Sequence, residues 1–85
     1  MEDKKLIGKV THYYGKLGVA IIELDDDLEY GDRISIEGAT TNIQQVVDSM
    51  QIEHKTVKTA RRGDAIGLKV PDMVRPGDVV YKVEE

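Results

Sequence analysis

The chain has 85 residues, of which 40% are hydrophobic and 33% charged, and its formal net charge is −4. These values are typical of one globular domain. The sequence has no apolar run near the roughly 20 residues of a membrane-spanning helix, and residues 1–5 lack the apolar stretch of a signal peptide. We therefore expect a single domain over residues 1–85, cytoplasmic and monomeric. Cysteine is absent, which excludes disulfides and thiolate metal sites.

The apolar residues favour strands over helices. The sequence has ten Val and eight Ile against five Leu, and β-branched side chains suit a pleated sheet better than a helix. Gly8, inside the first apolar segment, predicts a bulge or a bend. The nearly continuous apolar run of residues 17–24 predicts a central strand. Strands are expected over residues 6–14, 17–24, 33–37, 55–60, 64–70 and 79–83.

Residues 40–52 fit two descriptions. Ile43 and Val47 follow one period-two phase, whereas Val46 and Met50 follow the other, as in two strand halves separated by a bulge. The same apolar positions, 43, 46, 47 and 50, also match the spacing of a helix face. The β-branched content favours strand, and a helix over residues 43–52 stays open as the alternative.

The dipeptide Gly-Asp precedes an expected strand three times, at residues 31–32, 63–64 and 77–78. Glycine adopts the positive φ of a tight turn, and an aspartate carboxylate accepts hydrogen bonds from nearby backbone N–H groups. Six or seven short strands at such close turn spacing, without a helix signal, predict a small all-β barrel or sandwich. Closure into a barrel would also remove exposed strand edges.

The sequence lacks the motifs of common catalytic and metal sites. It has no phosphate-binding loop, no G-x-G-x-x-G after a strand and no G-x-S-x-G turn. His12 and His54, without cysteine, supply at most half of a zinc shell, and the acidic run at residues 25–27 lacks the spacing of a calcium loop. We expect neither enzymatic activity nor a metal or cofactor.

A binding surface is the remaining functional hypothesis. Tyr14 stands between Lys9 and Lys16, and aromatic side chains beside cations stack on bases and contact phosphates. Arg61 and Arg62 form a basic turn suited to bidentate phosphate contacts. These five residues are the candidate nucleic-acid site. The alternative is an ordinary strand tyrosine and a turn that only adds solubility.

The order of the sequence blocks resembles domain two of the translation GTPases. The matching blocks are GKV at residues 8–10, YGDRISIEG at 30–38, ARRGDAIGL at 60–68 and RPGDVV at 75–80. The resemblance implies a small closed six-stranded antiparallel barrel, as in free-standing elongation-factor-like proteins. It brings no GTPase activity, because that chemistry lies in a domain outside these blocks.

The resemblance implies a non-catalytic docking module of the translation or RNA-modification machinery, with tRNA or ribosomal RNA as the ligand. Lys69-Val70 stands where the family often has Arg-Gly, so the RNA contacts do not carry over residue by residue. A similar barrel ends some peptidases of the U32 family, and residues 40–52 are closer to those. The alternative function is therefore a protein-interaction accessory, such as a detached partner of a U32-type enzyme.

Overall fold

The computed structural model describes residues 3–84, and these residues form strands, turns and loops without a helix. The predicted all-β class is therefore confirmed. No helix in this range could cross a membrane. The strands are β1 (Asp3–Tyr14), β2 (Val19–Leu24), β3 (Leu28–Glu29), β4 (Arg33–Glu37), β5 (Asn42–Val46), β6 (Met50–Ile52), β7 (Lys55–Val57), β8 (Thr59–Ala60), β9 (Ala65–Lys69) and β10 (Val79–Glu84).

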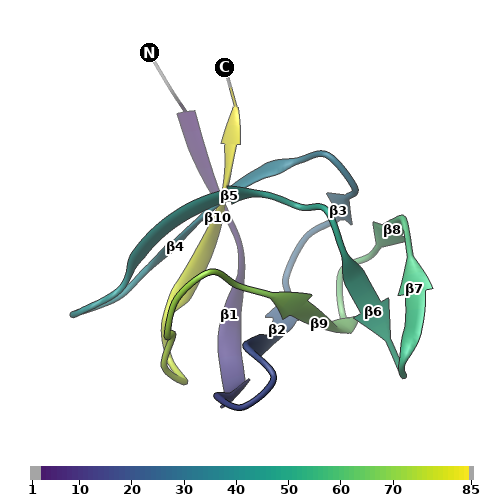
Figure 1. The fold of residues 1–85 in the computed structure, drawn as a ribbon. Helices are drawn as coiled ribbons and strands as arrows, with labels where there is room; N and C mark the ends of the chain where they lie inside the picture. The colour runs from purple at the N-terminus through teal and green to yellow at the C-terminus, as the bar shows by residue number, and fades with distance from the viewer. Residues whose placement is uncertain (1–2, 85) are drawn as a thin grey trace.

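Eight strands form one antiparallel sheet that curls into a half-barrel (Figure 1). Their order is β5-β4-β10-β1-β2-β9-β6-β7, and β3 pairs with β8 in a separate two-stranded sheet. The expectation of a closed six-stranded barrel is wrong, because no backbone ladder between described strands joins the two ends of this sheet. The edge strands β5 and β7 stay open.

The sheet stays open because residues 42–52 split into two strands with different neighbours. β5 pairs with β4, whereas β6 pairs with β7 and β9. The N–H of Val47 donates to the carbonyl of Asp32 at 2.8 Å, and the chain then leaves β4 before β6 begins. Residues 40–52 therefore contain two strand halves rather than a helix, and the phase change seen in the sequence marks the break.

The long strand β1 serves both halves of the sheet. Its first part pairs with β10 and its second part with β2, and the register shifts at Leu6/Gly8 and again at Val10/His12. A Cβ on Gly8 would lie 2.5 Å from the carbonyl oxygen of Glu23, so only glycine permits this backbone approach. The bulge predicted at Gly8 is confirmed.

The three Gly-Asp pairs form the same turn. The glycines have φ values of 91°, 91° and 97°, as the third position of a type II turn requires. In each turn the Asp carboxylate accepts a 2.9 Å hydrogen bond from the backbone N–H three residues earlier. The residue pairs joined in this way are Glu29–Asp32, Arg61–Asp64 and Arg75–Asp78.

Each of these turns is anchored to a buried residue of another segment. The glycine N–H donates to the carbonyl of that residue at 2.8 Å, and the N–H of that residue donates to the Asp carbonyl at 2.8–2.9 Å. The anchored pairs are Gly31 with Val47, Gly63 with Leu24 and Gly77 with Val10. The internal repeat in the sequence thus sets three equivalent corners of the half-barrel.

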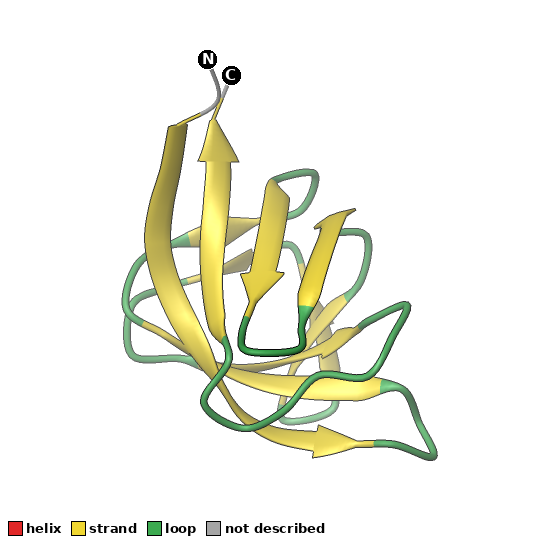
Figure 2. Ribbon diagram, turned by 90° about the vertical axis from the view of Figure 1, so that its left-hand side faces the viewer, coloured by secondary structure: helices red, strands yellow, loops and turns green. Residues whose placement is uncertain are grey.

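One apolar cluster fills the concave side of the sheet. Its side chains come from alternating positions of the strands, for example Ala20 and Ile22 in β2 and Ile66 and Leu68 in β9. Figure 2 shows the curled sheet from another side, with the start of β1 beside the end of β10. The convex surface carries the remaining positions of the same strands.

Candidate protein-docking face

Two of the three outward-facing residues of β2 are apolar, where a half-exposed strand normally carries polar residues. Val19 and Ile21 alternate with the buried Ala20 and Ile22, so they face outward, and both are only half-buried. Tyr14 is 47% exposed and Leu17 is 67% exposed at the adjacent hairpin. We call Tyr14, Leu17, Val19 and Ile21 the outer apolar face.

Strand register places these residues in rows across the sheet. Tyr14 pairs with Val19, and His12 pairs with Ile21. Ile21 in turn lies opposite Gly67 of β9, and Gly67 lies opposite Gln51 of β6. These rows therefore extend over four neighbouring strands, from β1 through β2 and β9 to β6.

Gly67 lines a hollow of about 520 Å³ in this face. A Cβ at this position would lie 3.5 Å from Val19 Cγ1 and 3.7 Å from Ile21 Cδ1, which are ordinary van der Waals distances. The backbone therefore does not need glycine here. Its lack of a side chain leaves Val19 and Ile21 accessible to a partner.

The two-residue turn between β6 and β7 borders the hollow. Glu53 and His54 have φ values of 51° and 66°, as in a type I′ hairpin turn, which usually contains Asn and Gly. Non-glycine residues in this region cost about 1–3 kcal/mol each. The turn places a carboxylate and an imidazole among the residues that line the hollow, beside Gln51 and the apolar side chains.

Two of the predicted site residues lie at this face. Tyr14 belongs to it, and Lys16 lies in the exposed hairpin turn between Tyr14 and Leu17. The rings of His12 and Tyr14 are 4.4 Å apart with an interplanar angle of 53°. Tyr13, by contrast, packs against the core.

The other predicted residues lie elsewhere. Lys9 precedes Tyr14 by five residues on β1, about 16 Å at 3.3 Å per residue, and it lies opposite Glu23. Arg61 and Arg62 form a turn anchored at Leu24, the end of β2 farthest from Lys16. The five residues therefore form no single cluster, and their role in nucleic-acid binding stays a prediction.

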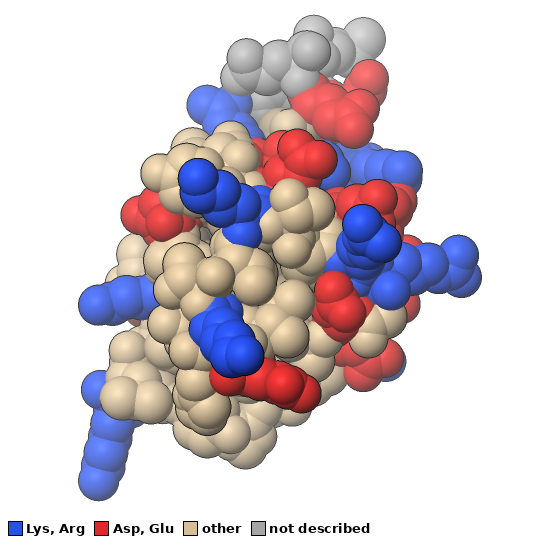
Figure 3. All heavy atoms as spheres, turned by 90° about the vertical axis from the view of Figure 1, so that its right-hand side faces the viewer, with Lys and Arg blue, Asp and Glu red and all other residues tan. Residues whose placement is uncertain are grey.

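Acidic groups surround the Arg61–Arg62 turn. The backbone N–H of Arg61 donates to Asp64, and that of Arg62 donates to Asp27 Oδ1 at 3.4 Å. Figure 3, which views the side of β6 and β7, shows positive and negative side chains interspersed, with uncharged surface between them. Among residues 3–84, no three His, Cys, Asp or Glu side chains gather as a metal site would require.

Sequence reasoning missed Leu17, Val19, Ile21 and Gly67 as parts of a surface. The nearly continuous apolar run of residues 17–24 predicted a central strand, and β2 does lie in the middle of the sheet. Only its inward side is covered among the described residues.

The chain is similar in sequence to parts of a protease and of a collagenase. It is 49% identical over 80 residues to an uncharacterized protease of Methanocaldococcus jannaschii and 38% identical over 84 residues to a collagenase of Porphyromonas gingivalis. The matches cover 93% and 96% of this chain but only 20% and 23% of those proteins. The chain thus spans about a fifth of the length of the curated relatives. No family model matches it.

The fold of the chain is also similar to that of a solved domain. The C-terminal domain of a protein assigned as a U32 peptidase in Geobacillus thermoleovorans superposes with a TM-score of 0.86, at 23% identity over 95% of this chain and 93% of that domain. Its selenomethionine variant gives a TM-score of 0.87 at 22% identity, over 92% of this chain and 99% of that one. The chain therefore has the fold of a U32 C-terminal domain. These similarities support the expected likeness to the U32 barrel and not the assignment to domain two of translation GTPases.

Proposed function

We propose that residues 1–85 form a non-catalytic docking domain that binds a U32-type polypeptide through the outer apolar face. The observation that carries the proposal is the pair Val19 and Ile21, which are apolar and accessible on a central strand. Exposed apolar patches with a polar rim are typical of protein interaction sites. Tyr14 adds an aromatic side chain of the kind that dominates interface energies.

The comparisons support this choice of partner. In the protease and collagenase relatives, a segment similar to this chain makes up about a fifth of the polypeptide. We propose that the present domain serves the same kind of protein, and that peptide-bond chemistry belongs to the remaining four fifths of such a polypeptide. A domain that holds its partner needs complementary surface rather than catalytic side chains.

The test is binding of this chain to the Methanocaldococcus jannaschii relative from which the matching 80 residues have been removed. We expect a complex whose Kd changes less than about twofold when salt rises, because apolar contacts are not screened. Leu17→Ser with Ile21→Thr should weaken binding by at least about tenfold. Met73→Ser is the control, since Met73 is 61% exposed outside this face. Equal binding by both variants would refute the assignment of the face.

RNA is the second candidate ligand. The observation that favours it is the contact of the His12 and Tyr14 rings beside Lys16, because bases stack on such rings. The distance from this site to Arg61 and Arg62 and the net charge of −4 are less favourable. A salt titration against tRNA separates the candidates, since RNA affinity falls steeply with salt.

A further inference from the structure

The strand β5 has one free backbone edge. Among residues 3–84 it pairs only with β4. The N–H of Val47 points to β4, where it donates to Asp32. Because hydrogen-bonding direction alternates along an antiparallel strand, Gln45 also faces β4, whereas the N–H and C=O groups of Gln44 and Val46 point away. The edge therefore offers backbone donors and acceptors to another strand.

This edge lacks the features that usually prevent strand addition. Residues 38–47 (GATTNIQQVV) contain no charge and no proline, although 33% of the whole chain is charged. Natural edge strands are commonly protected by lysine, proline or a bulge. The outward side chain of Val46 is 53% exposed. The edge is thus suited to bind an extended peptide.

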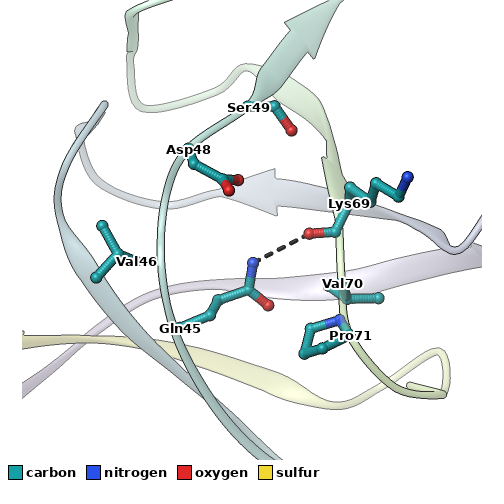
Figure 4. Close-up of a pocket in the computed structure, with 7 residues that line it drawn as sticks. All are labelled: Gln45, Val46, Asp48, Ser49, Lys69, Val70 and Pro71. Atoms are coloured by element: carbon teal, nitrogen blue, oxygen red, sulfur yellow. Dashed lines mark hydrogen bonds between the residues drawn. The ribbon is translucent and has the colours of Figure 1, made fainter.

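A groove of about 540 Å³ adjoins the end of this edge (Figure 4). Gln45, Val46, Asp48 and Ser49 form one wall, and Lys69, Val70 and Pro71 form the other. Gln45 Nε2 donates to the Lys69 carbonyl at 3.0 Å across the groove. Gln45 Oε1 is buried and has no hydrogen-bond partner among the described residues.

We propose that the free edge of β5 binds an extended peptide segment as an added strand. Its backbone pairs with Gln44 and Val46, an apolar side chain enters the groove beside Val70 and Pro71, and a Lys or Arg lies near Asp48. The exposed carboxylate of Asp48 lines one wall of the groove and the exposed Lys69 lines the other, so the cation of the peptide lies on the Asp48 side. The net charge of −4 also favours a basic partner. This surface is separate from the outer apolar face, so the inference does not rest on the proposed function.

A second copy of the chain is a poorer occupant than a peptide. Two five-residue edges paired with each other would bury well below the roughly 1,200 Å² of a stable protein interface. A peptide strand adds groove contacts to the backbone pairing, and specific side-chain pockets next to an edge are typical of β-strand addition.

The test measures amide hydrogen exchange by NMR, with a synthetic peptide of alternating valine and threonine that has lysine at both ends. We expect saturating peptide to slow exchange at Gln44 and Val46 by about tenfold or more, because these N–H groups become bonded. Exchange at Gln45, which already faces β4, should not change. The same peptide, N-methylated at alternate residues facing β5, should give no protection.

Two variants at one position separate backbone pairing from side-chain contact. Gln44→Pro removes the outward N–H and should abolish peptide binding, whereas Gln44→Ala keeps this N–H and should bind within about twofold of the original chain. Asp48→Asn should weaken binding and reduce its salt dependence. Protection by the N-methylated peptide, or unchanged binding by Gln44→Pro, would overturn the proposal. Protection that rises with protein concentration alone would replace the peptide with a second copy.

Discussion

Gly38 lies against the buried carboxylate of Asp78, and a Cβ at position 38 would overlap with Asp78 Oδ1. Asp78 cannot easily move away, because its Oδ2 accepts the Arg75 N–H at 2.9 Å and its backbone is bonded to Val10. The contact joins the end of β4 to the turn before β10. No positive φ is involved at Gly38, so the requirement for glycine comes from space alone.

We therefore predict that Gly38→Ala lowers the free energy of unfolding by about 1–3 kcal/mol, as overpacking does. In the Asp78→Ala background the same substitution should cost almost nothing, since the crowded oxygen is absent. Urea denaturation of the two single variants and the double variant provides the cycle. An equal cost in both backgrounds would show that the carboxylate is not the obstacle.

Gly63 and Gly67 should respond oppositely to alanine. Gly63 has open space around its Cα but a φ of 91°, so Gly63→Ala should destabilise the fold by about 1–2 kcal/mol through backbone strain. Gly67 has ordinary contacts and no positive φ, and Gly67→Ala should be neutral or stabilising by up to about 1 kcal/mol. Thermal unfolding of the two variants tests the contrast; a greater loss at Gly67 would contradict it.

Substitutions in the left-handed turn at Glu53 and His54 should increase the stability of the fold. Replacing the pair with Asn and Gly, as Glu53→Asn with His54→Gly, supplies the residues that a type I′ turn favours. We expect a gain of about 1 kcal/mol or more in the free energy of unfolding, measured by urea denaturation. The reversed pair, Glu53→Gly with His54→Asn, is a control of the same composition and should gain less.

Acidic pH should remove the stability that the carboxylates of Asp26 and Glu37 contribute to the folded state. The hydrogen bond from Lys5, whose Nζ lies 2.6 Å from Asp26 Oδ2, lowers the pKa of Asp26. Hydrogen bonds from Lys4 and then Ser35 lower the pKa of Glu37. A lowered pKa in the folded state adds stability above the ordinary carboxyl value of about 4. That stability is lost as the pH falls through the lowered pKa.

Asp26→Asn should therefore lose less stability than the original chain between about pH 5 and pH 2. Denaturation midpoints across this range measure the difference, which should be small because the pair is exposed to solvent. Asp25→Asn, in the same acidic turn, is the matched control. The hydrogen bond with Asp26 also raises the pKa of Lys5. The stability that Lys5 contributes is therefore lost only when the pH rises through this raised pKa.

Local features of the fold followed from the sequence because each depends on a few adjacent residues. The Gly8 bulge and the three Gly-Asp turns are of this kind. The openness of the sheet did not follow, because it depends on which distant strands β5 and β6 meet. The two-residue strand β3 was not predicted, since Leu28–Glu29 reads as part of a turn until Thr59–Ala60 lies beside it. The strand expected over residues 55–60 divides into β7 and β8.

The candidate site was predictable only in part. Tyr14 and Lys16 were predicted as site residues because an aromatic residue near a cation can be recognised from the sequence. Val19 and Ile21 were predicted only as part of a central strand. Periodicity shows which residues share a side of a strand, but it does not show whether another layer covers that side. The free edge of β5 could not be predicted for a similar reason. The tertiary fold, and not the local sequence, determines which strands pair with β5.

The pairing of the first and last strands has a mechanical consequence. Asp3 lies opposite Glu84 at the start of β1 and the end of β10, which lie side by side (Figure 2). Five further antiparallel pairs continue the ladder, with one bulge between Leu6 and Gly8. Inter-strand hydrogen bonds run perpendicular to such strands, so tension applied at both ends pulls along these bonds. The hydrogen-bonded pairs would then break one after another. Under shear, by contrast, all the pairs would bear the load together. Stretching by single-molecule force spectroscopy should therefore detach β1 from β10 at low force.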